Sequence, residues 1–166
     1  MGFFDKVKQF AGGKGMADVV ITDVERQPVE HASMTFTDSV VKGTMVVTAK
    51  EPCQILATKY EIGIRYFRDG QEFNTYVAAA FDPEPNTSYS DDCTKFPVDM
   101  TPGQTLRQPF LVSEVDLASA IAKNGITDPA GAVASGTVKM TLKCIADVKG
   151  SPFDPSSEVL VQLRPS

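Results

Sequence analysis

The sequence contains no tryptophan and only one histidine in 166 residues. A Ser/His/Asp or Cys/His catalytic site would have to use His31, which lies in PVEHASM with no nucleophile motif nearby. We interpret His31 as a surface or strand-end residue, and we predict no catalytic residues and a protein that is not an enzyme. The lack of tryptophan also disfavours a sugar-binding site, since such sites use exposed aromatic platforms.

Cysteines are few and widely separated. Cys53, Cys93 and Cys144 are odd in number, so a disulfide framework is not expected, and no C-x-x-C pair is present to hold zinc. Reduced thiols fit a cytoplasmic protein. The first residues lack the apolar segment and cleavage site of a signal peptide, and no apolar run reaches the roughly 20 residues of a membrane span. We therefore expect a cytoplasmic protein, with peripheral membrane contact as an alternative.

Basic residues are outnumbered. Sixteen Lys and Arg stand against 21 Asp and Glu, which gives a formal net charge of -5. Without a broad basic field, a nucleic-acid partner is not expected. The hydrophobic share of 42% and the charged share of 22% are ordinary for a globular protein, and the length suffices for a core without disulfides.

A glycine-rich stretch superficially resembles a phosphate-binding loop. In Gly12-Gly13-Lys14-Gly15, however, glycine takes the place of the Ser or Thr that follows the lysine of a P-loop, and no strand precedes it. A flexible turn explains the stretch better. We predict no cofactor.

An acidic loop has part of the pattern of a calcium site. Asp82, Glu84 and Asn86 have the alternate spacing of the first ligands of a calcium loop. Two prolines stiffen the segment, the turn glycine is absent, and Cys93 stands where a bidentate glutamate is needed. We predict no metal site. The interpretation of 82–92 is a solvated acidic loop, and calcium binding there stays an open alternative.

Alternating and β-branched runs predict seven to nine strands. Asp69-Gly70 is a strong hairpin signal, Gly43 marks a bulge or close contact, and Pro109 indicates an edge or a bend. Residues 82–103 and 128–136 are expected to be loops. The predicted strands cover 17–24, 40–50, 54–67, 71–81, 104–112, 137–148 and 158–165.

The alternation also predicts which side chains face the core. In the last long strand, one face carries Val138, Met140, Leu142 and Cys144. In the 54–67 strand, alternation places Ile55 and Ala57 on the face of Lys59 and Glu61, opposite Leu56, Thr58, Tyr60, Ile62 and Ile64.

Only two segments have a helical pattern. In the first, over 3–10, Phe3, Val7 and Phe10 recur at helical spacing before the glycines. The second covers 113–124: Ser113 and Asp116 fit a capping box, and Gly125 ends the helix. The apolar face of this second helix is expected to bury Val115, Ala118, Ile121 and Ala122.

Many strands at near-regular intervals with few helices define an all-β fold. We predict an antiparallel, immunoglobulin-like or arrestin-like β-sandwich. It forms a single domain over 16–166, with one short inserted helix near 113–124. A short N-terminal amphipathic helix with a glycine hinge precedes it over 1–15.

Three stretches carry a resemblance to a known family. VVKGTMVVTAKEPCQILATKYEIGIRY (40–66) resembles a strand pair of arrestin-like domains, and LRQPFLV (106–112) matches a proline-phenylalanine strand. The tail VKMTLKCIADVKGSPFDPSSEVLVQLRP (138–165) looks like the end of bacterial sporulation-control (SpoOM-type) proteins. The chain departs from this family in its insertion at 113–136 and in having one sandwich where many relatives have two.

The resemblance implies a non-catalytic interaction or scaffold domain. Its surface would bind a protein partner, for example by adding a strand to an exposed edge. One alternative is a homo-oligomeric structural subunit of a sheath, tube or shell. Another is a weak peripheral membrane adaptor.

The N-terminal segment is the candidate contact site. Three lysines against one aspartate give residues 1–15 a charge of +2, so the remainder carries -7 and the total is -5. Such a segment could dock on its own sandwich, on a neighbouring subunit or on anionic lipid. The predicted partner-contact or lipid-contact residues are Phe3, Phe4, Lys6, Val7 and Phe10.

Overall fold

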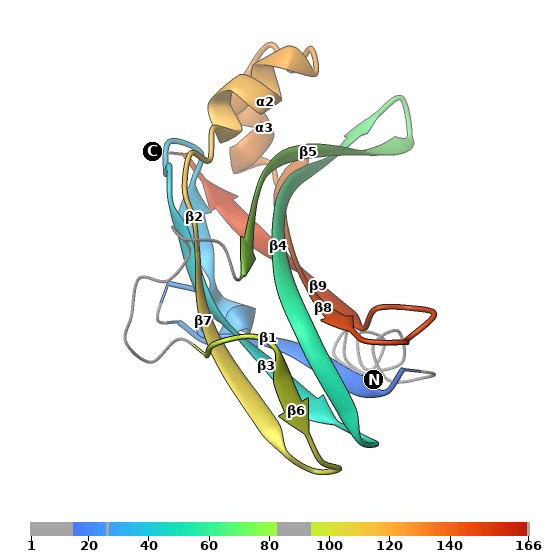
Figure 1. The fold of residues 1–166 in the computed structure, drawn as a ribbon. Coiled ribbons are helices and arrows are strands. Elements are labelled where there is room, and N and C mark those ends of the chain that lie inside the picture. The colour runs from blue at the N-terminus through green and yellow to red at the C-terminus, as the bar shows by residue number, and fades with distance from the viewer. Residues whose placement is uncertain (1–14, 26, 83–93, 166) are drawn as a thin grey trace.

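The computed structural model describes residues 15–25, 27–82 and 94–165, which form two β-sheets packed face to face (Figure 1). The smaller sheet is antiparallel and has the order β1-β3-β7. Its strands are β1 (Ala17–Thr22), β3 (Val41–Ala49) and β7 (Thr105–Val112).

The larger sheet has six strands in the order β2-β9-β8-β4-β5, with β6 paired to the start of β4. All of its pairings are antiparallel except that of β2 with β9, which is parallel. Its strands are β2 (Ser33–Thr35), β4 (Cys53–Arg68), β5 (Gln71–Asp82), β6 (Val98–Met100), β8 (Val138–Val148) and β9 (Ser156–Arg164).

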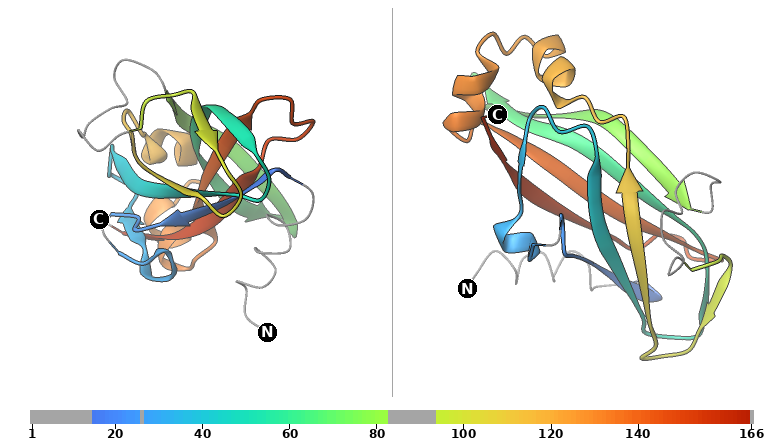
Figure 2. Two further views of the ribbon diagram at one scale, coloured as in Figure 1. Left: turned by 60° about the horizontal axis from the view of Figure 1, so that its bottom comes forward. Right: turned by 90° about the vertical axis from the view of Figure 1, so that its left-hand side faces the viewer.

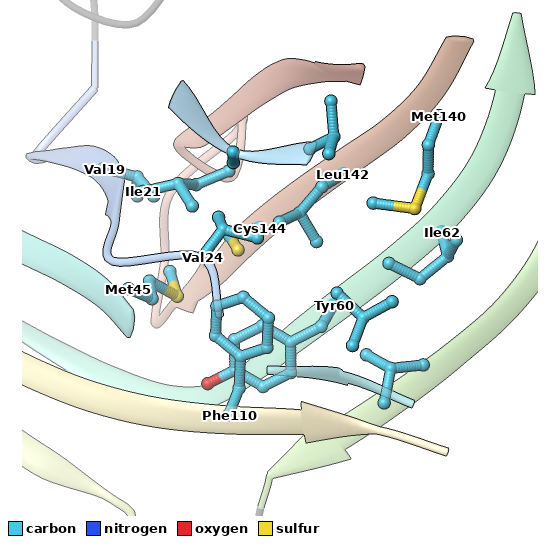
Figure 3. Close-up of a cluster of buried hydrophobic side chains, with 14 of the residues drawn as sticks. Val19, Ile21, Val24, Met45, Tyr60, Ile62, Phe110, Met140, Leu142 and Cys144 are labelled. Atoms are coloured by element: carbon cyan, nitrogen blue, oxygen red, sulfur yellow. The ribbon is translucent and has the colours of Figure 1, made fainter. Parts of the chain in front are cut away.

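The core fills the space between the sheets (Figure 3). At its centre the rings of Tyr60 and Phe110 stack with centroids 4.4 Å apart. A Cβ at Gly43 would lie 2.6 Å from the Phe110 ring, so only glycine fits opposite that ring. Gly43 is thus a close-contact point, one of the two roles predicted for it.

Several predictions from the sequence are confirmed. All seven predicted strands are present, and Val138, Met140, Leu142 and Cys144 are buried. Pro109 lies on β7, an edge strand of the smaller sheet. Asp69 and Gly70, with φ of 52° and 75°, form the two-residue turn between β4 and β5.

The alternation predicted at the start of β4 is wrong. Ile55 is fully buried and Leu56 is 36% exposed, the reverse of the expected arrangement. The cause is an irregularity in the pairing with β8 between Ile55 and Ala57. An extra residue there exchanges the faces of the side chains before and after it.

The inserted helix exists but begins later than predicted. Helix α2 spans Leu117–Lys123, and Asp116, not Ser113, is its N-cap; the Asp116 carboxylate accepts from Ser119 N at 2.9 Å. Ser113 is exposed and lies outside the helix. The prediction of the buried face was also partly wrong, because Ala122 is exposed and Ala118 is only half-buried. The helix buries Leu117, Ala120 and Ile121, and Val115 is buried just before it.

Short elements were missed. Residues 128–136 were expected to be a loop but contain helix α3 (Pro129–Ala134), capped by the Asp128 side chain. A 3-10 turn, η1 (Val29–His31), and the short strands β2 and β6 were not predicted. Helices α2 and α3 lie at one end of the sandwich, and β6 lies at the opposite end (Figure 2).

Candidate functional site

The residues considered for chemistry do not form a reactive centre in the described structure. His31 is exposed at the end of η1, and none of the described side chains hydrogen-bonds to it. Within residues 15–25, 27–82 and 94–165, no three metal-ligating side chains gather. The calcium ligands proposed after Asp82 lie outside the described residues.

The prediction that Asp82 belongs to a solvated loop is wrong, because Asp82 is the last residue of β5, lies inside the sandwich and is 3% exposed. Its Oδ2 accepts hydrogen bonds from Tyr60 Oη at 3.0 Å, Gln108 Nε2 at 3.2 Å and Thr58 Oγ1 at 3.3 Å. Gln108 Oε1 in turn accepts from Thr94 N at 2.9 Å. Because these residues come from β4, β5 and β7, the buried carboxylate joins the two sheets.

Two buried groups, the Tyr60 hydroxyl and the Cys144 thiol, are held in their neutral forms. Burial raises the pKa of the Tyr60 hydroxyl, with the neighbouring Asp82 charge acting in the same direction. Burial also raises the pKa of the Cys144 thiol, which is fully enclosed. Tyr60 therefore acts as a neutral hydrogen-bond donor, and Cys144 has little thiolate to serve as a nucleophile.

The outer face of the six-stranded sheet offers a surface for contact. Its side chains form rows across β5, β4, β8 and β9. One row has two apolar residues, a lysine and a serine, the next carries alternating charges, and the third is centred on a glycine. The three rows are Phe81–Lys59–Ile145–Ser156, Ala79–Glu61–Lys143–Glu158 and Tyr76–Gly63–Thr141–Leu160.

A shallow hollow opens at Gly63 on this face, bordered by Asn74, Tyr76, Thr141 and Lys143. A Cβ at Gly63 would lie 2.7 Å from Thr141 Oγ1 and 2.8 Å from the Thr75 carbonyl oxygen, so a side chain does not fit there. The register with β5 shifts at this point. A bulge beside a glycine thus shapes the middle of the face.

Strand β5 is the exposed edge of this sheet. No described strand pairs with its outer side. It is 12 residues long, and from Phe73 to Phe81 it contains neither a charge nor a proline. Tyr76 is 66% exposed and Phe81 is 41% exposed. An uncharged edge with exposed aromatics is a surface on which another strand can pair.

The contact residues predicted from the sequence are not among those that line the described surface. Phe3, Phe4, Lys6, Val7 and Phe10 lie outside the described residues, so their role stays a prediction. Tyr76 and Phe81 were not predicted as contact residues. The uncharged run FNTYVAAAF was visible in the sequence, but strand order was needed to show that this run lies at an edge.

Fold and surface together define a mainly antiparallel β-sandwich with an exposed edge strand. The structure is similar to that of Spo0M, the sporulation control protein of Bacillus subtilis, with a TM-score of 0.54 and 16% identity over 93% of this chain. The match covers 51% of the Spo0M chain, so this chain spans about half its length. The resemblance predicted from the sequence is thereby confirmed at the level of the fold.

A protein from Archaeoglobus fulgidus matches with a TM-score of 0.36 and 15% identity, over 89% of this chain and 96% of that one. No family model and no curated protein sequence matches the chain. In the part of the chain that the structure describes, no helix is long and apolar enough to cross a membrane.

Proposed function

We propose that this protein is a non-catalytic interaction domain that binds an extended segment of a protein partner along β5. The observation that carries the proposal is the unpaired, uncharged edge from Phe73 to Phe81. The similarity of the fold to that of Spo0M, a sporulation control protein, agrees with this proposal. A cytoplasmic location remains part of the same prediction.

The edge is suited to strand addition in two ways. Its free N–H and C=O groups would bind any extended backbone, and its exposed side chains would select among sequences. Tyr76 and Phe81 project on the outer face, on either side of the bulge at Val77. We therefore expect a partner segment with apolar side chains at alternate positions and no proline within the paired part.

The test selects binders from a random peptide display library against the full chain. Ala79→Lys places a charge on the outer face of the edge, where it should weaken peptide binding by about ten-fold or more because edge lysines oppose strand pairing. Val20→Lys is the matched control: Val20 is a 51% exposed residue on β1 of the other sheet. Hydrogen exchange should slow in β5 when peptide is bound.

Peptides that bind Ala79→Lys as well as the unaltered chain, or that protect strands other than β5, would contradict the proposal. Turnover of a substrate by the purified protein would also contradict it, if substitutions in β5 left that turnover unchanged.

The same edge supports a second candidate function, self-assembly, because an uncharged edge can pair with a copy of itself. Sedimentation velocity over a range of concentrations distinguishes the two. A monomer that binds peptides favours partner binding. A dimer or polymer dispersed by Ala79→Lys but not by Val20→Lys favours the structural subunit.

A further inference from the structure

A second apolar surface lies on the outer face of the larger sheet, in the two rows of paired residues that are closest to β6. We call it the Ile145 patch and define it as Leu56, Ala57, Ile145 and Phe81. Leu56 and Phe81 are 36% and 41% exposed, and the other two are half-buried. Lys59, which lies between Ile145 and Phe81, is paired with Glu61 at 2.5 Å and holds its ammonium 5.2 Å from the Phe81 ring.

The described chain begins beside this patch. A Cβ on Gly15 would be 3.7 Å from Pro155 Cβ. The Pro155 carbonyl oxygen accepts a hydrogen bond from Ala146 N at 2.9 Å, and the next residue, Ser156, pairs with Ile145. Gly15, the first described residue, therefore lies one strand away from Ile145.

The size and chemistry of the N-terminal segment match the patch. As a helix, residues 3–10 would be about 12 Å long at ~1.5 Å per residue. The patch extends from β8 across β4 to β5, about 10 Å at a strand spacing of ~4.8 Å. Phe3, Val7 and Phe10 recur on one face of that helix. The segment's charge of +2 opposes the -7 of the rest, and exposed Asp147, paired with Ala57, lies at the rim.

We infer that residues 3–10 dock as a helix, within the same chain, on the Ile145 patch. Gly12 and Gly13 provide the bend, since glycine adopts turn conformations without steric cost. The docked helix would cover Phe81 and the outer face beside it, and it would leave Tyr76 and the edge N–H and C=O groups of β5 open to a partner strand. This inference goes beyond the proposed function, because the occupant is a segment of this chain and not a partner.

The test uses the absence of tryptophan. Phe10→Trp in the full chain introduces the only indole, whose emission and acrylamide quenching report its burial. In the monomer, we expect blue-shifted emission and several-fold weaker quenching than in denaturant. Ile145→Lys should return both readouts toward the exposed values, and Val20→Lys on the other sheet should leave them unchanged. Leu56→Lys, at a more exposed position, is the second variant in case Ile145→Lys does not fold.

Several results would overturn the inference. One is water-like emission of the introduced indole in the monomer. Another is a blue shift that Val20→Lys removes and both patch variants preserve, which would place the helix on the β1 face. A blue shift found only at concentrations where the chain dimerises would assign the segment to a second copy. A shift found only with phosphatidylglycerol vesicles would assign it to lipid. None of these readouts depends on a partner, so the proposed function can fail or succeed independently.

Discussion

At the scale of single residues, the two sheets are joined by one stacked pair and one buried carboxylate. Phe110 of β7 lies between Gly43 on its own sheet and Tyr60 on the other. The Tyr60 hydroxyl then donates to Asp82. The same tyrosine therefore supplies apolar contact at its ring and a polar contact at its tip, which is how a tyrosine is accommodated in a core.

Alternation in the sequence was sufficient to predict the inward residues of β8. Leu142→Ala should cost about 2–5 kcal/mol of unfolding free energy, because the side chain is fully buried and its removal leaves a cavity. Lys143→Ala, the next residue on the outer face, should stay within about 0.5 kcal/mol. Urea denaturation of both variants measures the difference. Equal, small effects would show that the inner face of β8 is assigned incorrectly.

Tyr60→Phe tests the polar link. Removing the hydroxyl leaves the buried Asp82 carboxylate with one donor fewer, which should cost about 1–3 kcal/mol although ring stacking is kept. Tyr76→Phe, at an exposed tyrosine, is the matched control and should change stability little. The measurement is again urea denaturation, and a neutral Tyr60→Phe variant would mean that this hydrogen bond adds nothing to folding.

At the scale of elements, the inserted helices show where local pattern fails. Both Ser113 and Asp116 are good cap residues, and the prediction from the sequence chose Ser113, which was wrong. The structure favours Asp116, because Val115 N bonds to Ser39 O and Glu114 has a left-handed φ of 58°, so the chain is not helical before Asp116. Helix α3 is only 6 residues long and begins with proline, so its sequence lacks the repeated apolar period that predicts a helix.

Asp116→Ala should destabilise α2, and Ser113→Ala should not. The Ser119 hydroxyl and backbone N–H both bond to the Asp116 carboxylate and lower its pKa below the ordinary value of an aspartate. A lowered folded-state pKa means that the stabilisation is present at neutral pH and is lost as pH falls through that pKa. The effect of Asp116→Ala on hydrogen exchange in α2 should therefore shrink in acid.

A pH-independent effect of Asp116→Ala would contradict the role of the charged cap, and loss of α2 protection in Ser113→Ala would restore the cap first predicted from the sequence.

At the scale of the whole molecule, the sandwich was predictable but its edges were not. Periodicity within each strand indicated which side chains face inward. Strand order depends on contacts between segments far apart in the chain, such as β7 with β3 and β4 with β8. Edge strands are defined only by that order, so the exposure of β5 could not be derived from its own residues. The same reason explains why the links between Asp82, Tyr60 and Gln108 were missed.

The larger sheet should not open as a unit. Strands β4 and β8 lie in its middle, are paired on both sides and supply most of its fully buried side chains. By contrast, β2 and β6 are 3 residues long, and each pairs with only one strand in the described structure. Protection against exchange follows burial and pairing, so low-energy local openings should be confined to the short strands.

Native-state hydrogen exchange in low denaturant measures this order directly. We expect amides of Tyr60, Ile62 and Leu142 to exchange only through global unfolding, and those of Met34 and Asp99 to exchange through local openings that denaturant hardly changes. Leu142→Ala should then speed exchange of the first group by the full loss in global stability and leave the second group unaltered. Exchange of both groups at one common, denaturant-sensitive rate would contradict this order, because it would make the short strands part of a single cooperative unit with the central ones.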